Sequence, residues 1–217
     1  MNNAFQTPAP IAITVDVLSA EVTVIASDRS DTVVTVQPAD AAKKGDVRAA
    51  EHTKVEFAAG VLTVWTPKNW RTYAAFGGNP SIQVTIEAPA GSQLKATSGV
   101  GRLRTFGALG QSDLEIALGD ILVDLAADSV TAKTSKGDIR IAEAVRGVLS
   151  LETSVGELEV GIHPGSAVQL ETNTKQGSVR NRLPAVAGAQ ENIVRVYAHS
   201  ALGNINVHNA EAVSARA

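Results

Sequence analysis

The chain contains no cysteine, so disulfide bonds, thiolate nucleophiles and thiolate zinc sites are excluded. Aromatic residues are scarce at 4%, whereas hydrophobic residues make up 44% of the 217 residues. Any core must therefore be built from Val, Leu, Ile and Ala. This composition favours stacked aliphatic columns over the pocket of a globular enzyme.

The chain also lacks an excess of basic charge. Its formal net charge is -3 and its pI is about 5.8, which argues against a nucleic-acid partner. It contains no run of 18 apolar residues, so no membrane-spanning segment is expected. Residues 1–14 contain no basic residue and no apolar run of signal-peptide form. A cytoplasmic location is therefore expected, with surface association as the alternative if a leader is removed.

Catalytic motifs are missing as well. Neither a Gly-x-Ser-x-Gly elbow nor a phosphate-binding glycine loop with Lys-Ser/Thr occurs, and we expect no cofactor and no enzyme activity. A polysaccharide-active enzyme is the least favoured alternative, because it would need paired carboxylates in a groove. The four histidines lack metal-ligand spacing and are expected to be solvent-facing structural residues: His52, His163, His199 and His208.

What the sequence does contain is a phrase repeated six times between residues 94 and 207. Each repeat has a glycine, an aliphatic residue two positions later and, in five of the six, a hydroxyl residue three positions earlier. The glycines lie 18 to 26 residues apart and are Gly101, Gly119, Gly137, Gly156, Gly177 and Gly203. The hydroxyl residues are Ser98, Thr134, Thr153, Thr174 and Ser200. A period near 20 residues is typical of stacked-repeat proteins.

Within each repeat the apolar residues alternate with period two, which indicates two short strands that bend at the glycine. Glycine at the corner would supply a positive φ or room for tight stacking. We therefore predict an all-β fold, a single-stranded β-helix (β-solenoid) of right-handed winding. It would have about six C-terminal coils and an N-terminal β-rich capping region. Ile121, Ile139 and Leu158 should face inward in neighbouring layers, and the hydroxyl column should bond backbone groups at the corners.

The predicted organisation has three parts. Residues 1–90 form the β-rich region with a capping loop at 67–80, residues 91–208 the repeats, and residues 209–217 a flexible tail. The segment 38–51 breaks the strand pattern and is interpreted as a short helix or a loop.

Two groups of residues are candidates for binding. The loop around Trp70, Arg71, Tyr73 and Phe76 combines residue types that carry binding energy at interfaces, and it would either cap one end of the fold or bind a partner. Asp120, Asp138 and Glu157 each follow a corner glycine. They would line up as an acidic ladder, which serves either as a cation site or as polar turn residues.

The phrases Thr-Ser-Lys-Gly-Asp-Ile-Arg-Ile (134–141) and Thr-Ser-Val-Gly-Glu-Leu-Glu-Val (153–160), with the Pro-Ala-Gly-Ser turn (89–92), resemble a bacterial family. It is the β-strand-repeat family known as "putative adhesin", a domain of unknown function. This resemblance implies a β-helix and a non-catalytic scaffold or interaction module for an unknown protein partner. The alternative is self-association into filaments, as in the bactofilins.

Overall fold

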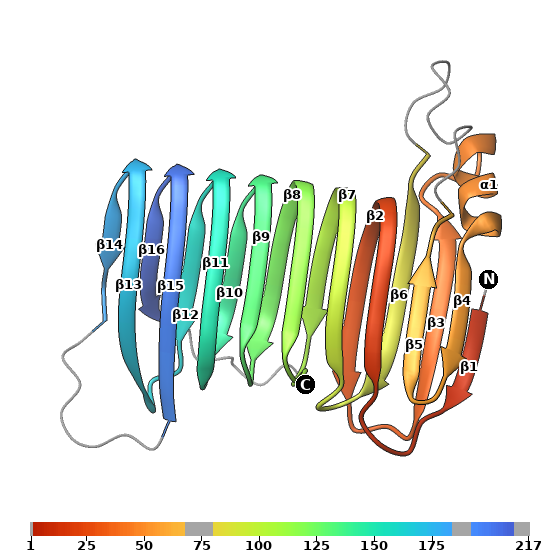
Figure 1. Cartoon of the computed structure of the whole chain (residues 1–217), viewed down its shortest axis with the longest axis horizontal. Helices are drawn as coiled ribbons and strands as arrows, with labels where there is room; N and C mark the ends of the chain where they lie inside the picture. Colours follow the sequence, from red (N-terminus) through yellow and green to blue (C-terminus); the bar gives the residue numbers. More distant parts are fainter. Residues whose placement is uncertain (1, 68–79, 184–191, 211–217) are drawn as a thin grey trace.

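The computed structural model describes residues 2–67, 80–183 and 192–210, which form sixteen strands and one helix (Figure 1). Up to the first gap the elements are β1 (Asn2–Gln6), β2 (Ala12–Ser27), β3 (Asp31–Pro38), α1 (Lys44–His52), β4 (Lys54–Ala58) and β5 (Val61–Trp65). They continue with β6 (Ile82–Pro89), β7 (Gln93–Phe106), β8 (Ser112–Ala126), β9 (Val130–Lys136), β10 (Ile139–Ala144), β11 (Gly147–Val155) and β12 (Leu158–Ile162). The last four are β13 (Ser166–Gln176), β14 (Val179–Asn181), β15 (Asn192–Leu202) and β16 (Ile205–Asn209).

All these strands belong to one sheet that folds over into two layers (Figure 1). The first layer runs β4, β5, the first halves of β2, β7 and β8, then β9, β11, β15 and β13. The second layer runs β1, β3, β6, the second halves of β2, β7 and β8, then β10, β12, β16 and β14. Three long strands therefore pass through both layers and tie them together.

The core lies between the layers and is almost entirely aliphatic. Buried and exposed positions alternate along each strand, as the period-two pattern predicts. Ile121, Ile139 and Leu158 lie opposite one another in neighbouring parallel strands and are each 0% exposed. Their predicted inward position is confirmed, and so is the all-β class.

The prediction of a single-stranded β-helix is nevertheless wrong. The sheet is mixed, because β1 with β3, β3 with β6 and β4 with β5 pair in antiparallel fashion. The repeats also do not follow one another in space, since β15 lies between β11 and β13, and β16 lies between β12 and β14. The arrangement is a sixteen-stranded, two-layered, sandwich-like sheet of the described residues. The repeated phrase identifies equivalent units, but it carries no information about the order in which they are placed.

The N-terminal end is closed by the antiparallel strands and by the helix. Phe5 on β1 and Phe57 on β4 meet there with ring centroids 5.3 Å apart, and α1 packs against β3 and β6. The buried Asp46 holds α1 in place, because its carboxylate accepts hydrogen bonds from the backbone N–H groups of Asp40 (3.1 Å) and Ser81 (3.0 Å). Within the described ranges, no helix has the length and apolar character needed to cross a membrane.

Candidate functional site

The six repeat glycines stack in one column at the bend between the layers. Their φ angles lie between 135° and 156°, a region that residues with a Cβ rarely adopt. A Cβ on any of them would lie 1.9–2.0 Å from the carbonyl oxygen of the equivalent residue in the neighbouring strand. In space the column runs Gly101, Gly119, Gly137, Gly156, Gly203, Gly177. The last repeat, that of Gly203, therefore lies between the repeats of Gly156 and Gly177. Backbone atoms of the neighbouring strand fill the space beside each glycine and leave no room for a side chain.

The hydroxyl residues before these glycines satisfy the carbonyl oxygens of the column. Thr134 donates to Gly119 O and Thr153 to Gly137 O, both at 3.1 Å. Thr174 likewise donates to Gly203 O at 3.0 Å. Ser200 bonds Gly156 O at 3.3 Å, whereas Ser98 bonds Val100 O within its own strand. The expected hydrogen bonds between hydroxyls and corner backbone are therefore present.

The three carboxylates of the acidic ladder accept hydrogen bonds from the neighbouring repeats. Asp120 accepts from the backbone N–H of Asp138 at 3.1 Å, and Asp138 accepts from that of Glu157 at 2.8 Å. Glu157 accepts from the side-chain amide of Asn204 at 2.8 Å. Arg102 lies 3.7 Å from Asp120 at the other end of the row. Asp120 and Asp138 thus cap backbone N–H groups of the next repeat. No group of three or more potential metal ligands occurs in the part of the chain that the structure describes.

The other sequence candidates do not form a site with these residues. Trp70, Arg71, Tyr73 and Phe76 lie outside the described residues, as does most of the expected capping loop at 67–80. The ring of His52 bonds Arg48 O at the end of α1. His163 pairs with Glu143 at 2.5 Å, and His199 lies half-buried on β15.

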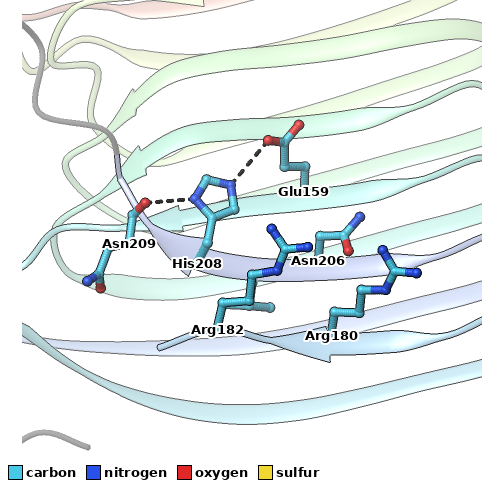
Figure 2. Close-up of a pocket in the computed structure, with 7 residues that line it drawn as sticks. Glu159, Arg180, Arg182, Asn206, His208 and Asn209 are labelled. Carbon is cyan, nitrogen blue, oxygen red and sulfur yellow. Dashed lines mark hydrogen bonds and ion pairs between the residues drawn. The ribbon is translucent and has the colours of Figure 1, made fainter. Parts of the chain in front are cut away.

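His208 is the exception, because it lines a pocket on the outer face of the second layer (Figure 2). The pocket has a volume of about 460 Å³ and is lined by Glu159, Arg180, Arg182, Asn206, Val207, His208 and Asn209. These residues come from β12, β16, β14 and the residue that follows β14. β14 ends at Asn181 and one further backbone bond joins Arg182 N–H to Val207 O (2.8 Å), while β16 continues to Asn209. The outermost strand thus stops short of its neighbour beside the pocket.

Two positively charged side chains of the pocket have no carboxylate partner among the described residues. Several other basic side chains on the outer faces are paired across neighbouring strands, as in Arg140–Glu159 (3.4 Å) and Lys133–Glu152 (3.3 Å). Arg180 and Arg182 have no carboxylate partner among the described residues, although both are exposed. In Figure 2 their side chains lie on the same side of the sheet as Asn206. Within the described ranges, these two guanidinium groups therefore keep their hydrogen-bond donors unpaired by any carboxylate.

The remaining polar groups of the pocket are held in place. The Nδ1 atom of His208 lies 2.7 Å from Asn209 O and its Nε2 atom lies 3.1 Å from Glu159 Oε1 (Figure 2). These two contacts fix the orientation of the His208 ring beside the arginines. Glu159, the one carboxylate among the described lining residues, pairs with Arg140 at 3.4 Å and lies 3.1 Å from His208 Nε2.

This chemistry suits an anion. Arginine binds carboxylate and phosphate groups through charge-assisted, often bidentate hydrogen bonds, and the amide of Asn206 adds a neutral donor. Hydrolysis of a glycosidic bond needs two carboxylates about 5–10 Å apart, and the described lining of this pocket contains Glu159 as its one carboxylate.

Sequence reasoning missed the pocket, although the repeat contains a signal for it. Arg180, Asn206 and Glu159 all stand three residues after a corner glycine. Arg180 lies opposite Asn206, and Asn206 lies opposite Glu159, in the parallel register. Alignment of the repeats by their glycines therefore finds this row, but only the observed order of the strands brings the three side chains together.

No protein-family model matches the chain, and no curated protein sequence matches it. Solved structures with a similar fold include a "putative cell adhesion protein" from Clostridium sporogenes. It has a TM-score of 0.45 and 12% identity, with 96% of this chain and 99% of that chain covered.

Two further structures are similar over their full lengths. A "putative lipid binding protein" from Parabacteroides distasonis has a TM-score of 0.40 and 12% identity, covering 97% of this chain and 96% of that one. A "putative adhesin" from Bacteroides fragilis has a TM-score of 0.38 and 11% identity, covering 95% and 96%. The adhesin designations agree with the resemblance of the sequence, whereas membership of a β-strand-repeat family is not shown. Identities and TM-scores of this size support no conclusion about ligand or partner.

Proposed function

We propose that this protein is a non-catalytic recognition module that binds the carboxylate or phosphate groups of an acidic partner. The single observation that carries the proposal is the pair Arg180 and Arg182. These are two exposed guanidinium groups that line one pocket and have no carboxylate partner in the described chain. His208 and Asn206 supply further donors beside them. The proposed binding requires neither a cytoplasmic nor a surface location.

The site is restricted to local recognition of an anionic group. The chain as a whole carries a net charge of -3, so long-range attraction of a polyanion is weak and contacts inside the pocket must supply the affinity. A hydrogen bond to a charged group contributes about 1.5–3 kcal/mol. Removal of both arginines should therefore lower the affinity for an anion by at least tenfold, since 1.4 kcal/mol corresponds to a factor of ten.

The test is isothermal titration calorimetry with two probes, inorganic phosphate and a hexaglutamate peptide, which separate phosphate from carboxylate recognition. The variant is Arg180→Gln with Arg182→Gln. The matched control is Arg104→Gln, because Arg104 occupies the equivalent repeat position on β7, opposite Leu122, and has no carboxylate partner in the described chain.

We expect at least one probe to bind the native chain and the Arg104 variant, with an affinity that falls as salt is added. The double variant should bind at least tenfold more weakly. Absence of binding by both probes, or equal binding by the double variant, would refute the proposal.

A further inference from the structure

The outermost strand of the first layer has an open edge. β13 pairs with β15 along its whole length, from Ser166 opposite Asn192 to Gln176 opposite Leu202. Its other edge meets no strand among the described residues. Eleven residues of backbone are thus available on that side, and unpaired edges of this length template pairing with another strand.

The core is also unfinished at this end. Val194 and Val196 on β15 are 0% and 1% exposed. Their neighbours in the last strand, Val168 and Leu170, are only partly buried against the core. In the other layer Val179 on β14 is 44% exposed. One more strand beside β13 would continue the buried columns by another layer.

At the opposite end of the molecule, the outer edges among the described strands are much shorter. The strands there, β1 and β4, are five residues long and antiparallel to their neighbours. The contact between Phe5 and Phe57 closes the core between them. Because the outer edges of β1 and β4 are less than half as long as that of β13, pairing of two copies through β13 is favoured and gives a closed pair.

We propose that β13 pairs with β13 of a second copy of this chain, antiparallel and around a twofold axis through Asn173. Even-numbered residues of β13 face the core and odd-numbered residues face solvent, as the bond from Thr174 to Gly203 O and the exposure of Glu171 show. A twofold axis must pass through a residue to keep inward side chains opposite inward ones. The allowed registers are therefore those in which the axis passes through a residue of β13, and each differs from the next by a shift of the axis by one residue.

Charge complementarity selects one register from this set. With the axis at Asn173, Glu171 of each copy lies opposite Lys175 of the other, twice by symmetry, while Thr172 lies opposite Thr174. An axis at Glu171 or at Lys175 places like charges opposite each other, and an axis at Thr172 places no charged pair together. Both charged residues are exposed and have no ion-pair partner within the described ranges. Opposite charges directly across a strand pair are stabilising and like charges are destabilising.

Charge reversal tests the register. Sedimentation velocity over a concentration series should show the native chain in equilibrium between monomer and dimer, with no larger species. Glu171→Lys places two pairs of lysines opposite each other, and Lys175→Glu places two pairs of glutamates. Each variant should raise the dissociation constant by on the order of tenfold or more.

An equal mixture of the two variants provides the internal control. One copy then carries Lys at both positions and the other carries Glu at both, so the mixed pair regains two attractive contacts. We expect the mixture to dimerise as well as the native chain does, which general destabilisation of either variant would not produce. Unchanged circular dichroism and melting temperature of each variant would confirm that it is folded.

Cross-linking gives a second readout, because the chain has no cysteine of its own. In the proposed register Asn173 lies opposite itself, with Cα atoms about 4.5–5.5 Å apart, which is within reach of a disulfide. Asn173→Cys should form a covalent dimer on mild oxidation, whereas Gln169→Cys on the same strand should not. A native chain that stays monomeric, assembles beyond a dimer, or cross-links equally through both cysteines would overturn the proposal. So would single variants that dimerise normally.

Discussion

Replacing Gly137 with alanine tests how closely neighbouring repeats approach each other at the bend. Gly137 has a φ of 147°, and a Cβ there would lie 2.0 Å from Gly119 O. That distance is about 1 Å shorter than the closest contacts that real Cβ atoms make, and the atom it meets is backbone and cannot rotate away. The repeats of Gly119 and Gly137 must therefore move apart at this point.

The cost follows from the bonds that cross the same gap. Three hydrogen bonds cross it: Ile121 N–H to Asp138 O at 2.9 Å, and the Thr134 hydroxyl to Gly119 O and Asp138 N–H to Asp120 Oδ1 at 3.1 Å. Each contributes about 0.5–1.5 kcal/mol, and a non-glycine residue in this φ region adds about 1–3 kcal/mol of strain. We expect Gly137→Ala to lower the free energy of unfolding by about 3–7 kcal/mol. That loss is a large part of the stability of an ordinary domain.

The measurement is urea unfolding followed by circular dichroism, at one protein concentration for all variants. Gly60→Ala is the matched control, because Gly60 also has a positive φ (77°) but a Cβ there meets nothing within 4 Å. Its loss should be limited to about 1–2 kcal/mol of backbone strain. If Gly137→Ala lowers the free energy of unfolding no more than Gly60→Ala does, neighbouring repeats do not depend on a glycine for their close approach, and the reasoning fails.

Three further variants test the core, the hydroxyl column and the N-terminal ion pair. Ile139→Asp places a carboxylate at a position that is 0% exposed, so the chain should lose its cooperative thermal transition. Thr153→Val should lower the free energy of unfolding by about 1–3 kcal/mol, measured in urea, because Gly137 O loses its donor. The hydrogen bond from Arg29 lowers the pKa of Asp31 below its usual value of 3.8, against a smaller opposing effect of desolvation. Asp31 thus contributes stability above about pH 4 that is lost as the pH falls through its lowered pKa. Asp31→Asn should remove that part of the acid sensitivity in melting curves recorded from pH 2 to pH 6.

The sequence predicts what is local and repeated. Period-two alternation places the buried residues correctly, as Ile121 and Ile139 show, because each strand has one face in the core. The spacing of Thr153 and Gly156 within one repeat predicts a hydroxyl beside the corner, where it bonds the carbonyl oxygen of Gly137 in the preceding repeat. Stacking of equivalent units then follows from their shared pattern.

The sequence does not reveal the order in which the units pack. The strand with Val194 and Val196 is more apolar at its inward positions than β13, where Thr172 and Thr174 stand. That difference marks β13 as the outer strand, but it is slight and becomes meaningful only once the doubled-back topology is known. The candidate pocket depends on this order, which is why residues picked from the sequence did not include it.

The last repeat packs between the two repeats that precede it in the sequence, and this order has a consequence for biosynthesis. β13 leaves the ribosome before β15, yet β15 is the native neighbour of β11. Until residues 192–202 emerge, the edge of β11 is open to β13, and we expect the inward Val168 and Leu170 to take the places beside β11 that Val194 and Val196 have in the finished protein. A nascent chain therefore meets a premature pairing that must open before the final strand can be inserted. Refolding from urea should show a slow phase that disappears in a chain from which residues 164–183 have been deleted.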